Sequence, residues 1–191
     1  MRYAEVSRKT NETDISLKLC VDGGTVSVNT GIGFFDHMLT AFAVHAGFGL
    51  DLTAKGDTWV DAHHTVEDTG IVLGKAFSQC VDKKGIARYG SFYIPMDESL
   101  AFASVDVSGR PYLVYNADFY GKGTGDFEVC LCEEFFRAFA FNAGITLHLQ
   151  VLYGSNDHHK AEALFKATAH ALKDAVKINS SEVLSTKGSL D

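Results

Sequence analysis

The sequence predicts an α+β protein of two duplicated half-domains, each a mostly antiparallel sheet with two helices on one face, fused into one compact unit. Stretches with strand-like alternation and stretches with helical spacing follow one another in the same order twice along the 191 residues. Residues 41–47 return as residues 138–144, at an offset of 97. A pair of histidines followed by a glutamate, starting at His63, returns at His158 with an offset of 95. Two repeats in the same order with nearly equal offsets indicate an internal duplication.

Each predicted element follows from the spacing of its apolar residues. Alternation predicts strands, and Gly23-Gly24 predicts a turn between the first two of them. Helical spacing predicts a first helix that ends at the glycines on either side of Phe48. In chain order, we expect strands at 15–21 and 26–28, a helix at 34–46, a strand at 50–54, a helix at 64–81, strands at 88–95, 100–107 and 112–117, a helix at 127–142, a strand at 145–152 and a helix at 158–176.

These elements are expected to form a single domain, with repeats at about 1–84 and 85–178 and a C-terminal tail at 179–191. A hydrophobic content of 46% with 21% charged residues is typical of a globular protein. No apolar run approaches the roughly 18 residues needed to cross a bilayer, and the first residues lack the apolar core of a signal peptide, so we expect a cytoplasmic protein without membrane contact. A net charge of −7 without a block of Lys and Arg argues against nucleic-acid binding.

Both copies of the repeated motif contain two adjacent histidines and a glutamate: His63-His64-x-x-Glu67 and His158-His159-x-x-Glu162. Neighbouring positions on a helix diverge by about 100°, so the two histidines of a pair face different places. The first histidine and the glutamate lie on the same face and can serve one ion. A single copy could equally be a solvated helix start with its glutamate near the positive end of the helix dipole. Two copies in a duplicated frame favour metal binding.

The duplication identifies one further ligand in each half. His37 begins the first helix, and Glu134 stands at the equivalent position 97 residues later. Imidazole and carboxylate without thiolate suit Mn²⁺, Fe²⁺, Co²⁺ or Zn²⁺, and four protein ligands leave open positions for substrate on an octahedral ion. The eight candidate ligands, four for each of two ions, are His37, His63, His64, Glu67, Glu134, His158, His159 and Glu162.

Seven stretches resemble imidazoleglycerol-phosphate dehydratase, in order from Arg8 to the C-terminus. They are residues 33–38, 61–68, 97–98, 108–112, 134–136, 156–167 and 185–188. The resemblance implies a manganese-dependent hydro-lyase of histidine biosynthesis, which converts D-erythro-imidazole-glycerol phosphate to imidazole-acetol phosphate and water. It also implies two Mn²⁺ ions per active site and a homo-oligomer of 24 subunits, with active sites formed between subunits.

The resemblance further implies how the ligands are divided. The first ion would be held by His37, His64, His158 and Glu162, and the second by His63, Glu67, Glu134 and His159. Many family members carry His at the position of Glu134 and Asp-Asp where this chain has Asp61-Ala62. A carboxylate can replace an imidazole on Mn²⁺, so Glu134 remains a candidate ligand whose affinity or metal preference can differ.

The same resemblance assigns substrate contacts that would each read as ordinary surface residues in isolation. The phosphate-binding set is Arg88, Arg110, Lys166, Ser185, Thr186 and Lys187. Guanidinium and ammonium groups are suitable donors for a phosphate dianion. Metal ions at both ring nitrogens would stabilise an imidazolate, loss of the hydroxyl would give a diazafulvene-like intermediate, and a carboxylate would then remove a proton from the next carbon. Glu12, which matches a substrate-contacting glutamate, and the metal-binding Glu67 and Glu162 are the candidate catalytic bases.

Two other functions remain possible from the residues alone. A dinuclear phosphohydrolase would also use paired metal ions and basic residues, although such sites usually depend on Asp and bridging carboxylates. A metal-storing or metal-assembled structural protein would use the eight ligands without catalysis. The basic residues that follow the ligand motifs disfavour this second alternative, because metal storage needs no phosphate site.

Overall fold

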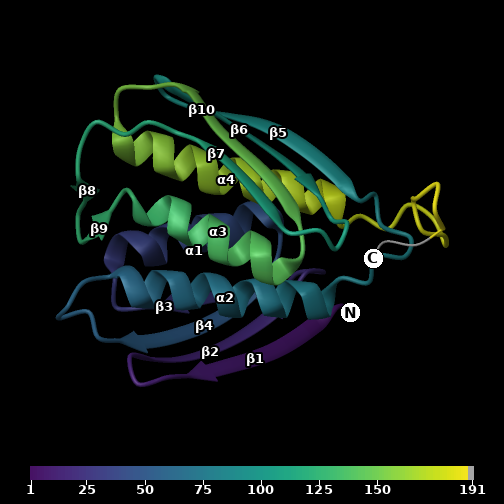
Figure 1. Ribbon diagram of the computed structural model, residues 1–191, viewed down its shortest axis with the longest axis horizontal. Helices are drawn as coiled ribbons and strands as arrows, with labels where there is room; N and C mark the ends of the chain where they lie inside the picture. Colours follow the sequence, from purple (N-terminus) through teal and green to yellow (C-terminus); the bar gives the residue numbers. More distant parts are fainter. Residues whose placement is uncertain (189–191) are drawn as a thin grey trace.

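The computed structural model describes residues 1–188, which form two four-stranded sheets with four helices between them (Figure 1). In the first sheet the strand order is β1-β2-β4-β3, and every neighbouring pair is antiparallel except β3 with β4. Its strands are β1 (Tyr3–Lys9), β2 (Thr13–Cys20), β3 (Val26–Asn29) and β4 (Gly49–Gly56).

The second sheet repeats this arrangement, with the order β5-β6-β10-β7 and a single parallel pair, β7 with β10. Its strands are β5 (Tyr89–Met96), β6 (Ser99–Asp106), β7 (Tyr112–Asn116) and β10 (Thr146–Tyr153). The identical strand order in the two sheets confirms the predicted α+β fold of two duplicated halves.

The helices lie in the middle of the molecule and join the two halves. They are α1 (Gly33–Ala46), α2 (His63–Cys80), α3 (Leu131–Ala143) and α4 (Asp157–Ala175). Helix α1 packs against α4 and α2 packs against α3, so each helix pair combines one helix from each half. Gly74 permits the close approach of α2 to α3, since a Cβ atom there would lie 2.6 Å from the carbonyl oxygen of Phe139. None of the helices within residues 1–188 is long and apolar enough to cross a membrane.

Two details differ from the elements predicted from the sequence. The third helix begins at Leu131 rather than at residue 127, because β9 (Phe127–Glu128) pairs with β8 (Gly123–Thr124) in a short hairpin. The apolar spacing also does not predict β1, whose inward-facing positions include Arg8 beside the apolar Ala4 and Val6. That strand is defined by its long antiparallel register with β2 rather than by its own pattern.

Candidate metal site

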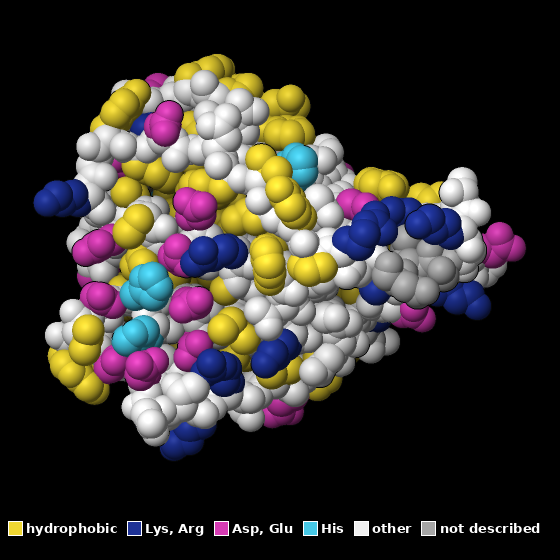
Figure 2. Space-filling model, viewed as in Figure 1, with side chains coloured by type: hydrophobic (Ala, Val, Ile, Leu, Met, Phe, Trp, Pro, Cys, Tyr) yellow, Lys and Arg dark blue, Asp and Glu magenta, His cyan; other side chains and the backbone are white. Residues whose placement is uncertain are grey.

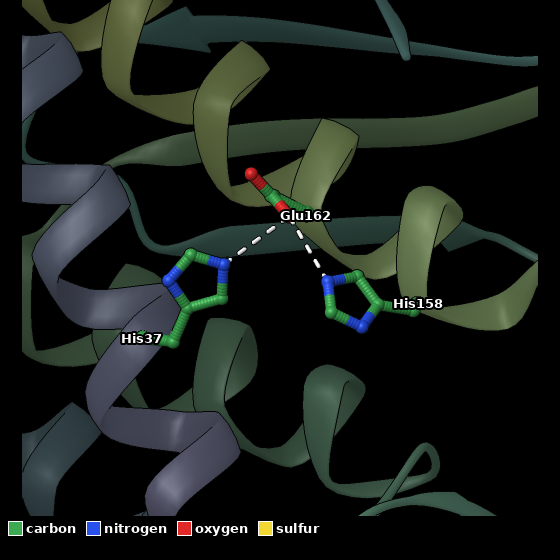
Figure 3. A group of neighbouring side chains, drawn as sticks. All are labelled: His37, His158 and Glu162. Carbon is green, nitrogen blue, oxygen red and sulfur yellow. Dashed lines mark hydrogen bonds and ion pairs between the residues drawn. The ribbon is translucent and has the colours of Figure 1, made fainter. Parts of the chain in front are cut away.

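Three of the candidate ligands meet where α1 crosses α4. Within residues 1–188, His37, His158 and Glu162 form the one cluster of three or more possible ligands whose atoms all lie within 4.8 Å of one another. The Oε2 atom of Glu162 lies 3.3 Å from His37 Nε2 and 3.1 Å from His158 Nε2 (Figure 3). One ligand therefore comes from the first half and two from the second.

The local sequence explains how α4 presents its ligands. Asn156 caps the helix, and its side-chain oxygen accepts hydrogen bonds from the backbone N–H groups of His158 and His159. The edge of the His158 ring packs against Phe34, with the ring centroids 5.0 Å apart. One turn after His158, Glu162 is buried, and its carboxylate faces the rings of both His37 and His158.

Glu162 is held in its ionised form. Burial alone would raise the pKa of Glu162, but the hydrogen bond and charge of Lys166, together with His37 and His158, keep it below the usual value. The ammonium of Lys166 lies 2.7 Å from Oε1 of the carboxylate, while Oε2 faces the two histidines. An anionic oxygen between two imidazole nitrogens is a suitable donor set for a divalent cation such as Mn²⁺.

The equivalent residues of the other helix pair are arranged differently. His63 Nε2 lies 3.8 Å from Glu67 Oε2 on α2, as the i, i+4 spacing predicts. Glu134 on α3 instead forms an ion pair with Arg137 one turn later, and among residues 1–188 it belongs to no three-ligand cluster. The second ion site thus remains a prediction from the sequence, with Arg137 as a direct competitor for the Glu134 carboxylate.

The second histidine of each motif points away from the glutamate of its own motif and toward carboxylates outside its helix. His64 Nδ1 lies 3.1 Å from Asp57, and His64 Nε2 lies 3.9 Å from Glu12. His159 Nδ1 lies 2.7 Å from Glu98. The hydrogen bond with Asp57 raises the pKa of His64, and the hydrogen bond with Glu98 raises the pKa of His159. The hydrogen bond from His159 is also the first cause of the lowered pKa of Glu98.

Sequence reasoning did not assign Asp57 or Glu98 a role. A signal for Glu98 was available in the duplication, because Glu12 immediately precedes β2 and Glu98 immediately precedes the equivalent strand β6. Each of these two glutamates lies beside the second histidine of a motif. Asp57 has no comparable signal, because it is identified only by its contact with His64.

The predicted phosphate-binding residues are divided between two places. Arg88 and Arg110 both donate to Asp106, and Arg88 also donates to the carbonyl oxygen of Leu184 in the tail, next to Ser185. Thr186 and Lys187 are exposed in the same tail, whereas Lys166 lies beside Glu162 on α4. Figure 2 shows two histidines among acidic side chains at the left and a group of Lys and Arg side chains at the right, around the tail.

Helix α4 separates the metal cluster from the arginines within one chain. His158 is in its first turn, whereas the backbone N–H of Arg88 donates to the carbonyl oxygen of its last residue, Ala175. At the helical rise per residue, these two ends of α4 are about 25 Å apart. A three-carbon chain between an imidazole ring and a phosphate, as in the substrate that the resemblance implies, is far shorter than this. His158 and Arg88 of one chain are therefore too far apart to contact the two ends of such a molecule.

Comparisons with known proteins agree on one family. A family model described as imidazoleglycerol-phosphate dehydratase matches residues 30–172. The chain is 57% identical over 194 residues to the imidazoleglycerol-phosphate dehydratase of Streptococcus sanguinis (strain SK36) and 58% identical over 192 residues to that of Methanosarcina mazei, with 100% of each chain covered.

Solved structures give the same result. The crystal structure of imidazoleglycerol-phosphate dehydratase from Staphylococcus aureus subsp. aureus N315 has a TM-score of 0.85 and 42% identity, covering 93% of this chain and 99% of that one. The structure of IGPD from Pyrococcus furiosus in complex with (S)-C348 has a TM-score of 0.85 and 40% identity, covering 97% and 100%.

Proposed function

The chain belongs to the imidazoleglycerol-phosphate dehydratase family, and from this premise we propose that it converts imidazole-glycerol phosphate to imidazole-acetol phosphate and water. It acts as a manganese-dependent hydro-lyase in the cytoplasmic pathway of histidine biosynthesis. The observation that supports the reaction best is the cluster of His37, His158 and Glu162, in which one anionic carboxylate faces two imidazole nitrogens.

Two metal ions fit the residues of the chain. The first is held by His37, His158 and Glu162, and the second by His63, Glu67 and Glu134. His64 and His159 face away from these groups, so each completes the site of a neighbouring copy. When bound, the two ions would supply Lewis acidity to the imidazole ring of the substrate and so allow that ring to act as an electron sink.

The protein then has to remove a proton from the carbon next to the one that loses its hydroxyl. Glu12 is the preferred base, because its side chain is half exposed to an incoming substrate and its carboxylate lies 3.9 Å from His64 Nε2. Glu67 and Glu162 are the alternative bases, although each also serves as a metal ligand. Glu98, beside His159, holds that imidazole in a fixed orientation.

Active sites shared between copies follow from the separation along α4. The ring binds at the metal end of one copy, and the phosphate binds at Arg88, Arg110 and the tail of another. Lys166 belongs to the metal end, where its ammonium lies 2.7 Å from Oε1 of Glu162. A contact between the metal end of one copy and the phosphate end of the next is heterologous, so further copies can add in the same way until the assembly closes on itself. This agrees with the 24-subunit homo-oligomer that we propose for this chain.

A turnover assay on chelator-stripped protein, with and without added Mn²⁺, tests the function. We expect the ketone product only when metal is present. Release of inorganic phosphate in place of ketone would instead identify a dinuclear phosphohydrolase. If metal binds tightly and neither product forms, the ligands serve structure alone and the proposed reaction is wrong.

A further inference from the structure

Asp106 is the common partner of the two arginines in the predicted phosphate site. Its Oδ1 atom accepts from Arg88 Nε at 2.7 Å, and its Oδ2 atom accepts from Arg88 Nη2 at 3.1 Å. The same Oδ2 atom accepts from Arg110 Nη2 at 3.2 Å. Asp106 is mostly buried at the end of β6, whereas Arg110 is exposed. One carboxylate thereby fixes the relative orientation of two guanidinium groups.

The pairing of both arginines with Asp106 leaves guanidinium N–H donors on the side that faces the C-terminal tail. Of the five N–H groups of Arg88, Asp106 takes two on the Nε–Nη2 edge, and the carbonyl oxygen of Leu184 takes one on Nη1 at 2.7 Å. Arg110 contributes one donor to Asp106 within the described part of the chain, so most of its N–H groups remain for an anion. Ser185, another residue of the predicted phosphate site, directly follows Leu184 in the chain.

The first half contains a similar Arg–Asp pair without a second arginine. Arg2 precedes β1 as Arg88 precedes β5, and its guanidinium donates to Asp22 and to the carbonyl oxygen of Val176. Gly24 occupies the position equivalent to Arg110, since both pairs are 86 residues apart. By the same offset, Asp22 corresponds to Ser108 and Asp106 to Cys20. The two Arg–Asp pairs are therefore alike in chemistry, and in each the arginine also binds a carbonyl oxygen beyond α4, but their carboxylates occupy different positions. Only the pair in the second half has another arginine beside it.

We propose that Asp106 is a positioning residue for phosphate, which aligns Arg88 and Arg110 as one binding surface for the phosphate of the substrate. This inference rests on the proposed function, because it assigns a role within the same site. Asp106 does not touch the phosphate; it acts through the two arginines and, through Arg88, on the position of the tail.

The test compares Asp106→Asn with the matched control Asp22→Asn in the Mn²⁺-loaded assembly. For Asp106→Asn we expect KM for the substrate and the inhibition constant of inorganic phosphate to rise roughly tenfold, with kcat within about twofold. Inhibition by free imidazole, a probe for the metal end, stays unchanged. Asp22→Asn leaves all of these constants at their wild-type values.

Unchanged or tighter phosphate binding in folded Asp106→Asn would overturn the inference, as would an equal effect of Asp22→Asn. Asp106→Glu keeps the charge but displaces the carboxylate, and we expect a smaller change in the same direction. If neither Asp106 variant assembles, Asp106 serves stability and the inference is also wrong. Phosphate binding measured by calorimetry does not depend on turnover, so an inactive wild-type protein that binds phosphate through Asp106 would refute only the proposed function.

Discussion

The guanidinium of Arg2 donates a 2.7 Å hydrogen bond to the backbone carbonyl oxygen of Val176, and so joins the start of the first half to the residue after α4. Its other side pairs with Asp22. Arg2→Met should lower the free energy of unfolding by about 1–2 kcal/mol, a range that allows for the partial exposure of the ion pair. Denaturant unfolding of protein stripped of metal with a chelator, at a fixed protein concentration, measures this change.

Lys9→Met is the control for that experiment, because the pair of Lys9 with Asp14 is largely exposed on both sides. We expect a change of less than about 0.5 kcal/mol for this variant. Equal effects of the two substitutions would contradict a specific role for the bond between Arg2 and Val176.

Asp126 caps α1 from a distant part of the chain and should make the fold sensitive to acid. Its carboxylate accepts from the backbone N–H groups of Gly33 at 2.8 Å and Phe34 at 3.2 Å. Burial alone would raise the pKa of Asp126, but these hydrogen bonds more than offset it and the pKa lies below its usual value. Because the folded pKa is lowered, the contribution to stability is present above the unfolded pKa and is lost as pH falls through the folded pKa.

Asp126→Asn should therefore lower stability by about 1 kcal/mol at pH 7 and by progressively less as the pH falls below about 4. Melting temperatures of wild type and variant between pH 7 and pH 3 measure the difference. A difference that stays constant over this range would show that the charge of Asp126 does not contribute.

The proposed sharing of the active site between copies predicts that two inactive variants complement each other. His158→Ala removes a metal ligand, and Arg110→Ala removes a donor at the opposite end of the chain. Each variant alone should have little activity. After chelation, equal mixing and reassembly with Mn²⁺, random assortment should restore roughly a quarter of wild-type turnover, because half of the metal ends and half of the phosphate ends are intact. Mixing without recovery would locate both groups in the site of a single chain.

The ion pair of Glu134 with Arg137 predicts opposite effects on metal content. Glu134→Gln should reduce bound Mn²⁺ from two ions to one per chain, since it removes a proposed ligand of the second ion. Arg137→Met should strengthen binding at that site about threefold by freeing the carboxylate. Elemental analysis after gel filtration measures the metal content of Glu134→Gln, titration of Mn²⁺ into chelator-stripped protein measures the affinity of Arg137→Met, and Glu133→Gln on the exposed side of α3 is the control for both. Two ions retained by Glu134→Gln would exclude this glutamate as a ligand.

Much of the fold could be predicted from the sequence because the duplication doubles each signal. The helix starting at His63 and the helix around His158 are identified by the same motif, and the structure confirms both. The start of α3 at Leu131 could not be predicted, because the apolar Phe127 belongs to a hairpin that only its partner β8 reveals.

The site was predictable only in part. Residue types and spacing identify His37, His158 and Glu162, and the structure brings all three together. Spacing within one helix carries no information about a partner from another element, so the contacts of His64 with Asp57 and of Glu134 with Arg137 were not foreseen. The pairing of each helix with a helix from the other half likewise depends on packing, and sequence spacing does not predict it. One example is the close approach of α2 to α3 at Gly74.

The crossing of α1 over α4 has a consequence for the origin of the chain. His37 and Glu162 belong to different repeats, so a half-length ancestor could have assembled this ligand set only as a homodimer. In such a dimer the two ligand sets are identical by symmetry, and every substitution changes both. A single polypeptide is free of that constraint, and this chain has an imidazole at position 37 and a carboxylate at the equivalent position 134.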